Sequence, residues 1–292
     1  MSQAAVRDAA APRRGLLRPR RRWLTLSATY LVFLVVLAIT LVPMLYLIAG
    51  GFRTTAQINA DPNELPHPWG WSNYGSVLTS SVFWRPLANS AIVAVVATVL
   101  AVGLGAMAAF ALSRYTFRGR EAWFLLFAAG LLFPANIAAI PLYLLLQRIG
   151  LLDNLFGVAI PQAAFSLPIT IVILRPFMRA IPGELEDAAV IDGATRIRFF
   201  LRILLPLSWP ALATVIILAF VVSWNAYLLP LVVFTSQNRF TLQLGVATFQ
   251  STYMQDTARV FAYTAVSMVP AIAVFLFAQR RLVGGLVGAV KG

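Results

Sequence analysis

Residues Glu184 to Pro206 read ELEDAAVIDGATRIRFFLRILLP, and this polar and amphipathic stretch lies between two long apolar runs. The acids at its start favour a helix N-terminus, where the helix dipole places partial positive charge. Gly193 permits a sharp bend, and a second segment follows from about Thr195, with Pro206 expected to end it. The pattern therefore predicts two short helices joined by a glycine hinge.

The second of these segments is amphipathic, because Arg196, Arg198 and Arg202 interrupt an otherwise apolar sequence. Such a helix can lie on a membrane surface. It can equally dock in the groove of a soluble partner. The residues of the loop leave both interpretations open.

The rest of the chain is unusually apolar. Of its 292 residues, 60% are hydrophobic and only 11% are charged, with a mean hydropathy of +0.81. Six segments reach the length of about 20 apolar residues that crosses a bilayer. They run roughly over residues 24–48, 87–112, 123–146, 155–174, 207–234 and 260–278. We therefore expect an all-α, polytopic membrane protein with six transmembrane helices.

The predicted spans divide the chain into a tail and one membrane domain. Residues 1–22 form an arginine-rich cytoplasmic tail, and residues 23–292 form the transmembrane domain, with residues 176–206 as its cytoplasmic loop. The first apolar run is about 25 residues long, which exceeds the core of a cleaved signal peptide. We therefore expect an uncleaved first helix.

Basic residues indicate the orientation of these spans. If the N-terminus is cytoplasmic, 18 of the 23 Lys and Arg residues lie in cytoplasmic segments and five lie outside. Positively charged loops favour the cytoplasmic side, so both termini are expected there. The net charge of +13 is explained by this bias and by anionic lipid, and nucleic acid is not an expected partner.

The predicted spans contain no acidic residue, since all ten Asp and Glu residues fall between them. Ion-driven carriers usually place ionisable groups at membrane depth. A membrane-embedded transferase or hydrolase needs a cluster of acids, histidines or metal ligands, whereas this chain has no cysteine and one histidine, His67. We therefore expect no catalytic residue and no bound metal, and an energy source in another subunit.

Some polar side chains do lie at or near membrane depth. Asn136, Gln162 and Asn225 are amides that must face protein or water, because an amide facing lipid is costly. Bonding between helices is one interpretation, and a solute path is the other. With Trp224 and Tyr227, which flank Asn225, these amides are the candidate pathway residues.

The loop resembles the EAA loop of bacterial ABC importer permeases. That pattern is E-A-A, three residues, G, nine residues and I-x-L-P. This sequence has Asp187-Ala188-Ala189, three residues, Gly193, nine residues and Ile203-Leu204-Leu205-Pro206. The one departure is Asp187 in place of glutamate.

The resemblance extends beyond the loop to the maltose-type carbohydrate permeases, and the chain resembles their MalG-like subunits. It is carried by the segments IDGAT, WNAYLLPLVVF and TLQLG and by the ending QRRLVGGLVGAVKG.

This resemblance implies a permease subunit that works with a MalF-like second permease, an ABC ATPase dimer and an extracytoplasmic solute-binding protein. ATP and Mg are then used by the ATPase, and this chain binds no cofactor. The outer loops, residues 51–86 and 235–259, are expected to meet the binding protein. The implied ATPase-docking residues are Glu186, Asp187, Ala188, Ala189, Asp192, Gly193, Ile203 and Pro206.

Two other functions stay open at this point. One is an ABC permease for a non-sugar solute, such as a glycerol phosphate, a peptide or phosphate. The other is a membrane-embedded lipid or glycosyl transferase, which the missing acid or histidine cluster disfavours. Only the maltose-type resemblance favours a sugar.

Overall fold

The computed structural model describes residues 19–249 and 256–289, and the side chains of residues 29–249, 256–274 and 276. These residues are mostly helical and contain no strand, which confirms the predicted all-α fold. Most of the arginine-rich tail predicted for residues 1–22 lies outside the described residues. The chain divides into two compact units, one ending at Leu47 and the other beginning at Ile48.

The first unit consists of most of α1, which runs over Pro19–Gly50. Nearly all its large apolar side chains from Tyr30 to Leu45 are exposed. This is the pattern of a helix solvated by lipid, since no polar face interrupts it. The helix begins a turn before the predicted span and passes through Pro43 without ending.

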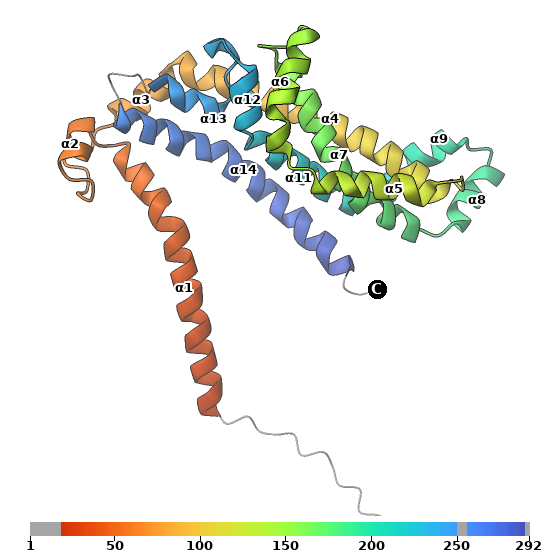
Figure 1. Ribbon diagram of the computed structural model, residues 1–292. Coiled ribbons are helices and arrows are strands. Elements are labelled where there is room, and N and C mark those ends of the chain that lie inside the picture. Colours follow the sequence, from red (N-terminus) through yellow and green to blue (C-terminus); the bar gives the residue numbers. More distant parts are fainter. Residues whose placement is uncertain (1–18, 250–255, 290–292) are drawn as a thin grey trace, which may run out of the picture. The chain divides into compact units, whose positions relative to one another are not determined.

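The second unit carries the remaining helices (Figure 1). Its long helices are α4 (Ser81–Arg114), α7 (Leu155–Ala180), α11 (Trp209–Trp224) and α14 (Thr257–Ala289). Shorter α-helices and several 3₁₀ turns precede α4 and connect the long helices. The shorter α-helices are α2 (Thr55–Ala60), α3 (Ser72–Thr79), α5 (Arg120–Ala129), α6 (Ala139–Arg148), α8 (Glu184–Ile191), α9 (Arg196–Phe199), α10 (Leu205–Leu207), α12 (Leu228–Val233) and α13 (Leu242–Gly245).

Four helices among the described residues are long and apolar enough to cross a membrane, and up to six spans result if each of two bent pairs counts as one. The first pair, Arg120–Leu132 with Ala135–Arg148, bends by 84° at Phe133 and Pro134. The second, Arg196–Leu207 with Trp209–Trp224, bends by 81° at Ser208. The predicted count of six spans therefore stays a prediction.

Two predicted spans are not single helices. The segment predicted at 123–146 breaks before Pro134, because proline cannot donate the helix hydrogen bond and restricts the residue before it. The segment predicted at 207–234 breaks at Asn225–Tyr227, between α11 and α12. By contrast, α7 continues past its predicted end at residue 174 through Pro176 to Ala180.

Helices α4 and α7 form the centre of the second unit, and α11 packs against both. Small residues allow this close packing: a Cβ added at Gly105 would lie 2.5 Å from Cγ2 of Thr170. Ala94, Ala97, Ala101, Ala106 and Ala109 are also buried along α4. The backbones of α4 and α7 therefore approach each other closely.

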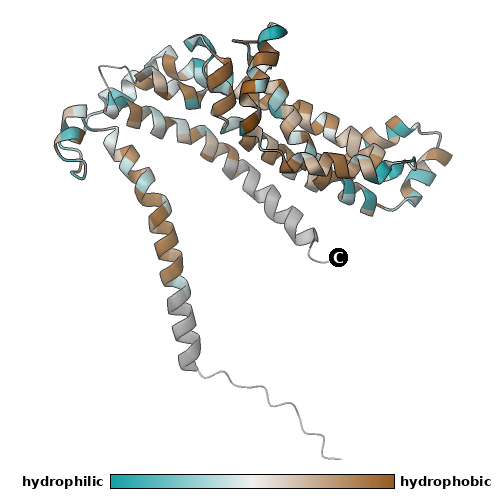
Figure 2. Cartoon of the chain, viewed as in Figure 1, coloured by the Kyte–Doolittle hydropathy of each residue, from teal (hydrophilic) through white to brown (hydrophobic). Residues whose placement is uncertain are grey.

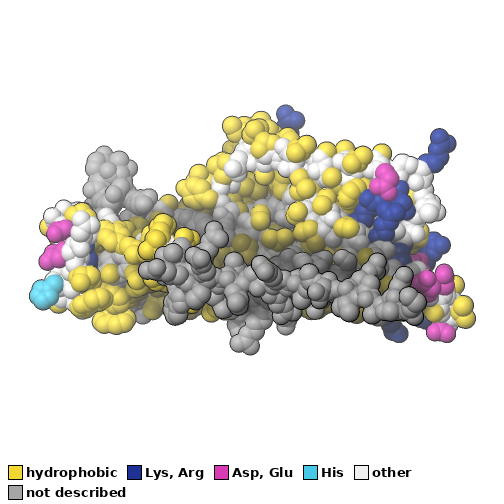
Figure 3. Space-filling view, turned by 90° about the horizontal axis from the view of Figure 1, so that it is seen from below, with side chains coloured by type: hydrophobic (Ala, Val, Ile, Leu, Met, Phe, Trp, Pro, Cys, Tyr) yellow, Lys and Arg dark blue, Asp and Glu magenta, His cyan; other side chains and the backbone are white. Residues whose placement is uncertain are grey.

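The two ends of this unit differ from its middle in polarity. Helices α8 and α9 lie at one end, and α2, α3 and α13 lie at the other (Figure 1). Hydrophobic residues dominate the long helices between them, and hydrophilic residues gather at the ends (Figure 2). The charged side chains visible in Figure 3 also lie mainly toward the ends. This is the distribution expected of a chain with an apolar band between two aqueous sides.

Candidate functional site

Helix α8 begins and ends as its residue types dictate. Its first turn holds Glu184, Glu186 and Asp187 at the positive end of the helix dipole. Its C-terminus closes in a Schellman arrangement, in which the amide of Ala194 donates to the carbonyl of Ala189 (2.8 Å) and that of Gly193 to Val190 (3.0 Å). Gly193 adopts φ +77°, a left-handed conformation that glycine adopts without steric cost. The predicted hinge is therefore a helix C-cap.

The second helix of the loop differs from the prediction at its end. Thr195 caps α9 by accepting from the amide of Arg198 (3.3 Å), and the chain then passes through a π-helical turn, Phe200–Leu204, into α10. Pro206 does not end this helix. It lies one residue before the end of the helical run Arg196–Leu207, and the sharp bend follows at Ser208.

The predicted docking residues divide between two faces of the loop. Ala189 is buried in a core cluster with Phe199, Phe200 and Leu204, and Ile203 packs against that cluster. Asp187, Ala188, Asp192, Gly193 and Pro206 are exposed. The structure thus separates Ala188 from Ala189, which the sequence had placed together in docking.

Several apolar side chains of the loop are exposed beside these polar ones. Leu185, Val190 and Ile191 extend from α8, and Ile197 extends from α9; Ile191 is 85% exposed. We refer to these four side chains as the apolar outer face of the loop. None of them is among the predicted docking residues, although they are the apolar positions that remain once the inward-facing positions are assigned.

Arg114, at the last turn of α4, joins the loop to the long helices. Its guanidinium donates to the carbonyls of Met178 (2.9 Å) and Ile181 (2.7 Å) at the C-terminal end of α7, where helix carbonyls run out of backbone donors. It also lies 4.0 Å from the carboxylate of Glu186 and 6.0 Å from the ring of Phe199. Glu186 therefore faces its own chain, and Arg114, counted in the sequence only as a topological charge, positions α8.

Arg175 forms a second junction among the long helices. It is 6% exposed, donates to the carbonyl of Leu112 (3.1 Å) and to the carboxylate of Glu121, and lies 4.0 Å above the ring of Phe124. A buried guanidinium is tolerated only with such partners. Arg175 therefore ties α4, α5 and α7 together.

The five candidate pathway residues line two cavities. Both cavities border the break between α11 and α12. A first cavity, of about 210 Å³, is lined by Asn136, Gln162 and Tyr227 among others. A second cavity, of about 400 Å³, is lined by Trp224, Asn225 and again Tyr227. Tyr227 borders both, because it lies in the non-helical stretch between α11 and α12. The structure therefore brings all five residues to one region.

Comparison with known proteins gives the family. Residues 101–284 match the family described as binding-protein-dependent transport system inner membrane component. The chain is also 37% identical over 268 residues to the diacetylchitobiose uptake system permease protein NgcG of Streptomyces coelicolor, a match that covers 91% of this chain and 88% of that one. This chain belongs to the family of binding-protein-dependent transport system inner membrane components.

A second relative and a solved structure agree with this assignment of the permease. The trehalose transport system permease protein SugB of Mycobacterium tuberculosis is 36% identical and covers 91% of this chain and 98% of its own length. The fold is similar, at a TM-score of 0.76 and 26% identity, to a chain of a bacterial ABC transporter involved in the import of the acidic polysaccharide alginate. That match covers 90% of the permease and 97% of the solved chain.

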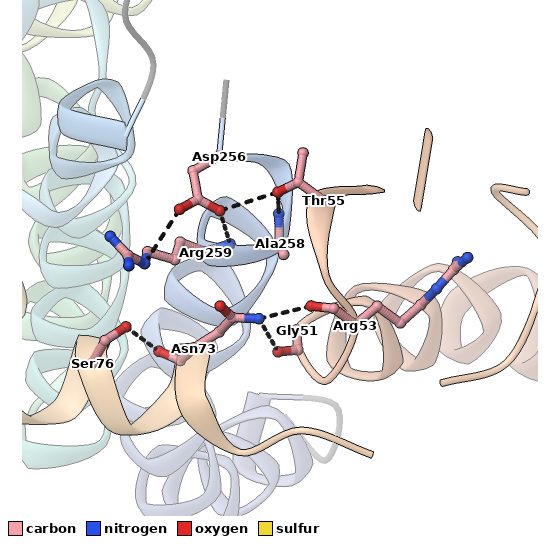
Figure 4. Close-up of polar contacts among 8 residues, drawn as sticks. All are labelled: Gly51, Arg53, Thr55, Asn73, Ser76, Asp256, Ala258 and Arg259. Carbon is pink, nitrogen blue, oxygen red and sulfur yellow. Dashed lines mark hydrogen bonds and ion pairs between the residues drawn. The ribbon is translucent and has the colours of Figure 1, made fainter. Parts of the chain in front are cut away.

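At the end of the permease away from α8, the predicted outer loops are held by a network of polar contacts (Figure 4). Asp256 accepts hydrogen bonds from the hydroxyl of Thr55 (3.2 Å) and the amide of Arg259 (3.1 Å), so it joins α2 to the start of α14. Asn73 donates to the carbonyls of Gly51 (3.0 Å) and Arg53 (2.8 Å). The segments from both predicted outer loops therefore form one connected surface.

Tyr74 adds a further link at this end. Its hydroxyl donates to the carbonyl of Ile48 at 2.7 Å. Burial raises the pKa of Tyr74 to about 12, so the phenol stays protonated and remains a donor at physiological pH. The connection from α3 to the end of α1 is therefore insensitive to ordinary pH changes.

Proposed function

We propose that this permease is the MalG-like subunit of an ATP-binding-cassette importer for a carbohydrate. The observation that carries the proposal is membership of the binding-protein-dependent family together with relatives named for the uptake of diacetylchitobiose and trehalose. In this assembly the chain lines half of the path and a MalF-like permease lines the other half. An extracytoplasmic binding protein delivers the sugar.

The energy source of the proposed importer is a separate ATPase dimer. This chain itself has no catalytic site, and ATP and Mg are used by the ATPase. The apolar outer face of the loop supports a docking role, because exposed apolar side chains on short helices are the usual contacts of helix-in-groove binding. Asp187 and Asp192, both exposed, add charges that basic groups of the ATPase can pair with.

The proposed orientation puts both termini in the cytoplasm. Helices α8 and α9 then face the ATPase, and the connected surface around Asp256 and Asn73 faces the binding protein. The two surfaces lie at opposite ends of the second unit, as this arrangement requires (Figure 1).

The test is transport by a reconstituted assembly. The permease is co-expressed with its partner permease, ATPase and binding protein, and proteoliposomes are assayed with labelled trehalose, N,N′-diacetylchitobiose and glycerol 3-phosphate. We expect ATP-dependent uptake of a carbohydrate and no ATP hydrolysis by the isolated permease. Uptake of glycerol 3-phosphate alone would refute the carbohydrate assignment and leave the family assignment intact.

A further inference from the structure

The first cavity lies where two helix breaks meet. Asn136 follows the break between α5 and α6, and Tyr227 belongs to the break between α11 and α12. Gln162, one residue after Pro161 in α7, completes the polar part of the lining. Segments far apart in the sequence therefore interrupt their helices around the same space.

Broken helices in apolar, membrane-embedded segments carry a specific physical meaning. Backbone groups released at a break cannot be satisfied by lipid, so such breaks are tolerated where they are buried in protein or line a water-filled cavity. One break can be a packing adjustment. Two breaks that border one cavity place backbone polar groups beside it.

Gln162 brings an amide to this cavity with part of its hydrogen-bonding capacity unused. The side chain is 7% exposed, its Oε1 accepts from the hydroxyl of Ser223, and its Nε2 has no partner. If the amide is turned by 180°, the Ser223 contact uses Nε2 and leaves the oxygen unpaired. A buried unpaired amide atom is costly, so a group that enters the cavity and can hydrogen-bond gains a partner already held in place.

The side chains that line the first cavity favour an uncharged ligand. The described residues around the first cavity include two amides, one tyrosine and otherwise apolar side chains, with no Lys, Arg, Asp or Glu among them. Anionic solutes such as phosphates and uronates are normally recognised by cationic side chains. Hydroxyl groups, which both donate and accept, suit amides and a phenol.

The size of the cavity limits how much of the ligand it holds. Its volume of about 210 Å³ exceeds what a single water needs but is below the roughly 300–1,000 Å³ of pockets that enclose drug-sized ligands. We propose that the first cavity is a subsite for one ring of a neutral carbohydrate, recognised by Gln162, Asn136 and Tyr227. The proposal rests on the proposed function and adds that the cargo is uncharged.

The experiment compares neutral and acidic sugars in the complete reconstituted assembly. Labelled trehalose and N,N′-diacetylchitobiose serve as neutral probes, and a labelled alginate trisaccharide serves as the acidic probe. We expect uptake of a neutral probe and none of the alginate fragment. Uptake of the acidic probe alone would overturn the subsite and leave a carbohydrate importer standing. An assembly that imports no sugar would overturn the proposed function and this inference with it.

Substitutions locate the effect in the cavity. Gln162→Leu should lower the uptake rate of the neutral sugar about three- to tenfold, the value of one lost hydrogen bond, while ATP hydrolysis stimulated by the binding protein changes less than twofold. A merely structural role would lower both together. Thr98→Val is the matched control, because Thr98 is equally buried on α4, has an unpaired hydroxyl and lines neither of the two cavities.

Two further variants protect the test against misfolding. Asn136 and Tyr227 are exposed, the latter at 51%, so Asn136→Ala and Tyr227→Leu should leave the folding of the permease itself unchanged. Each should also reduce neutral-sugar uptake more than ATP hydrolysis. Wild-type uptake in both of these variants would refute the subsite, whether or not Gln162→Leu assembles.

Discussion

At the scale of single residues, the permease depends on a few side chains whose partners come from distant helices. Arg114 is the clearest example, because one guanidinium satisfies the end of α7 and lies beside Glu186 of α8. Charge alone marks such an arginine as cytoplasmic. Its partners give it a second role, as the residue that holds α8 beside the ends of α4 and α7.

Arg114→Ala should therefore both destabilise the permease and uncouple it. Two part-buried carbonyls lose a charged donor, and a hydrogen bond to a charged group contributes about 1.5–3 kcal/mol. We expect a lower thermal midpoint of the purified permease and, in the assembly, less sugar imported per ATP hydrolysed. Arg118→Ala is the matched control, since Arg118 is exposed in the loop that follows α4. Equal behaviour of the two variants would exclude the positioning role.

Gly193→Ala isolates the backbone requirement at the end of α8. A Cβ there meets no atom within 4 Å, so the cost comes only from φ +77°, about 1–2 kcal/mol for an L-residue. Gly183→Ala, with φ −67° and equally open space, should cost much less. Thermal unfolding of the two purified variants measures the difference. Destabilisation of the same size at both positions would contradict the C-cap assignment.

At the scale of elements, the loop of α8 and α9 has an inner face that belongs to the core and an outer face that is available for docking. Ala189, Phe199 and Leu204 are buried beneath it. Deletion of the whole loop would expose this core, so loss of transport in such a deletion would not identify docking. Point substitutions on the apolar outer face are the cleaner probe.

Ile191→Glu should weaken binding of the ATPase with little effect on the permease itself. Ile191 is 85% exposed, and surface substitutions of this kind usually change folding stability by less than about 0.5 kcal/mol. An apolar anchor replaced by a charge should lower affinity for the ATPase at least about tenfold. Affinity is measured by titrating purified ATPase onto the permease pair in nanodiscs. The control is Leu65→Glu, which changes an exposed apolar site in the predicted outer loop. Equal ATPase affinity of the two variants would argue against docking at Ile191.

At the scale of the whole molecule, the question is which end of the second unit faces the cytoplasm. The biased distribution of basic residues favours the end that holds α8 and α9. The chain contains no cysteine, so single cysteines can be introduced as probes without first removing a native cysteine. Orientation can therefore be measured directly.

A membrane-impermeant maleimide should label Asn63→Cys in intact spheroplasts and Arg118→Cys only after permeabilisation. Both residues are exposed, so their accessibility depends on the membrane and not on folding. The reverse pattern would invert the proposed topology and place the loop outside the cell. Labelling of both sites in permeabilised cells provides the control for reactivity.

The sequence predicted the boundaries of local structure well where a single residue type determines them. The acids of α8, Gly193 and Thr195 fall at the helix ends expected from capping and dipole effects. The sequence did not predict that the second loop helix continues past Pro206 to Leu207. It also did not predict the helix breaks at Phe133–Pro134 and at Asn225–Tyr227. Proline predicts a helix end, but whether it occupies a first turn or an interior position depends on the neighbouring backbone.

The sequence by itself determined that this is an all-α membrane protein, and its loop spacing indicated a transporter of the ABC importer class. These properties depend on hydropathy and on the order of residues, which are local quantities. Only the tertiary structure decided that Arg114 positions α8, that Ala189 belongs to the core, and that Asn136, Gln162 and Tyr227 line one cavity. These are contacts between residues distant in the chain, and one sequence carries no direct record of which distant residues meet.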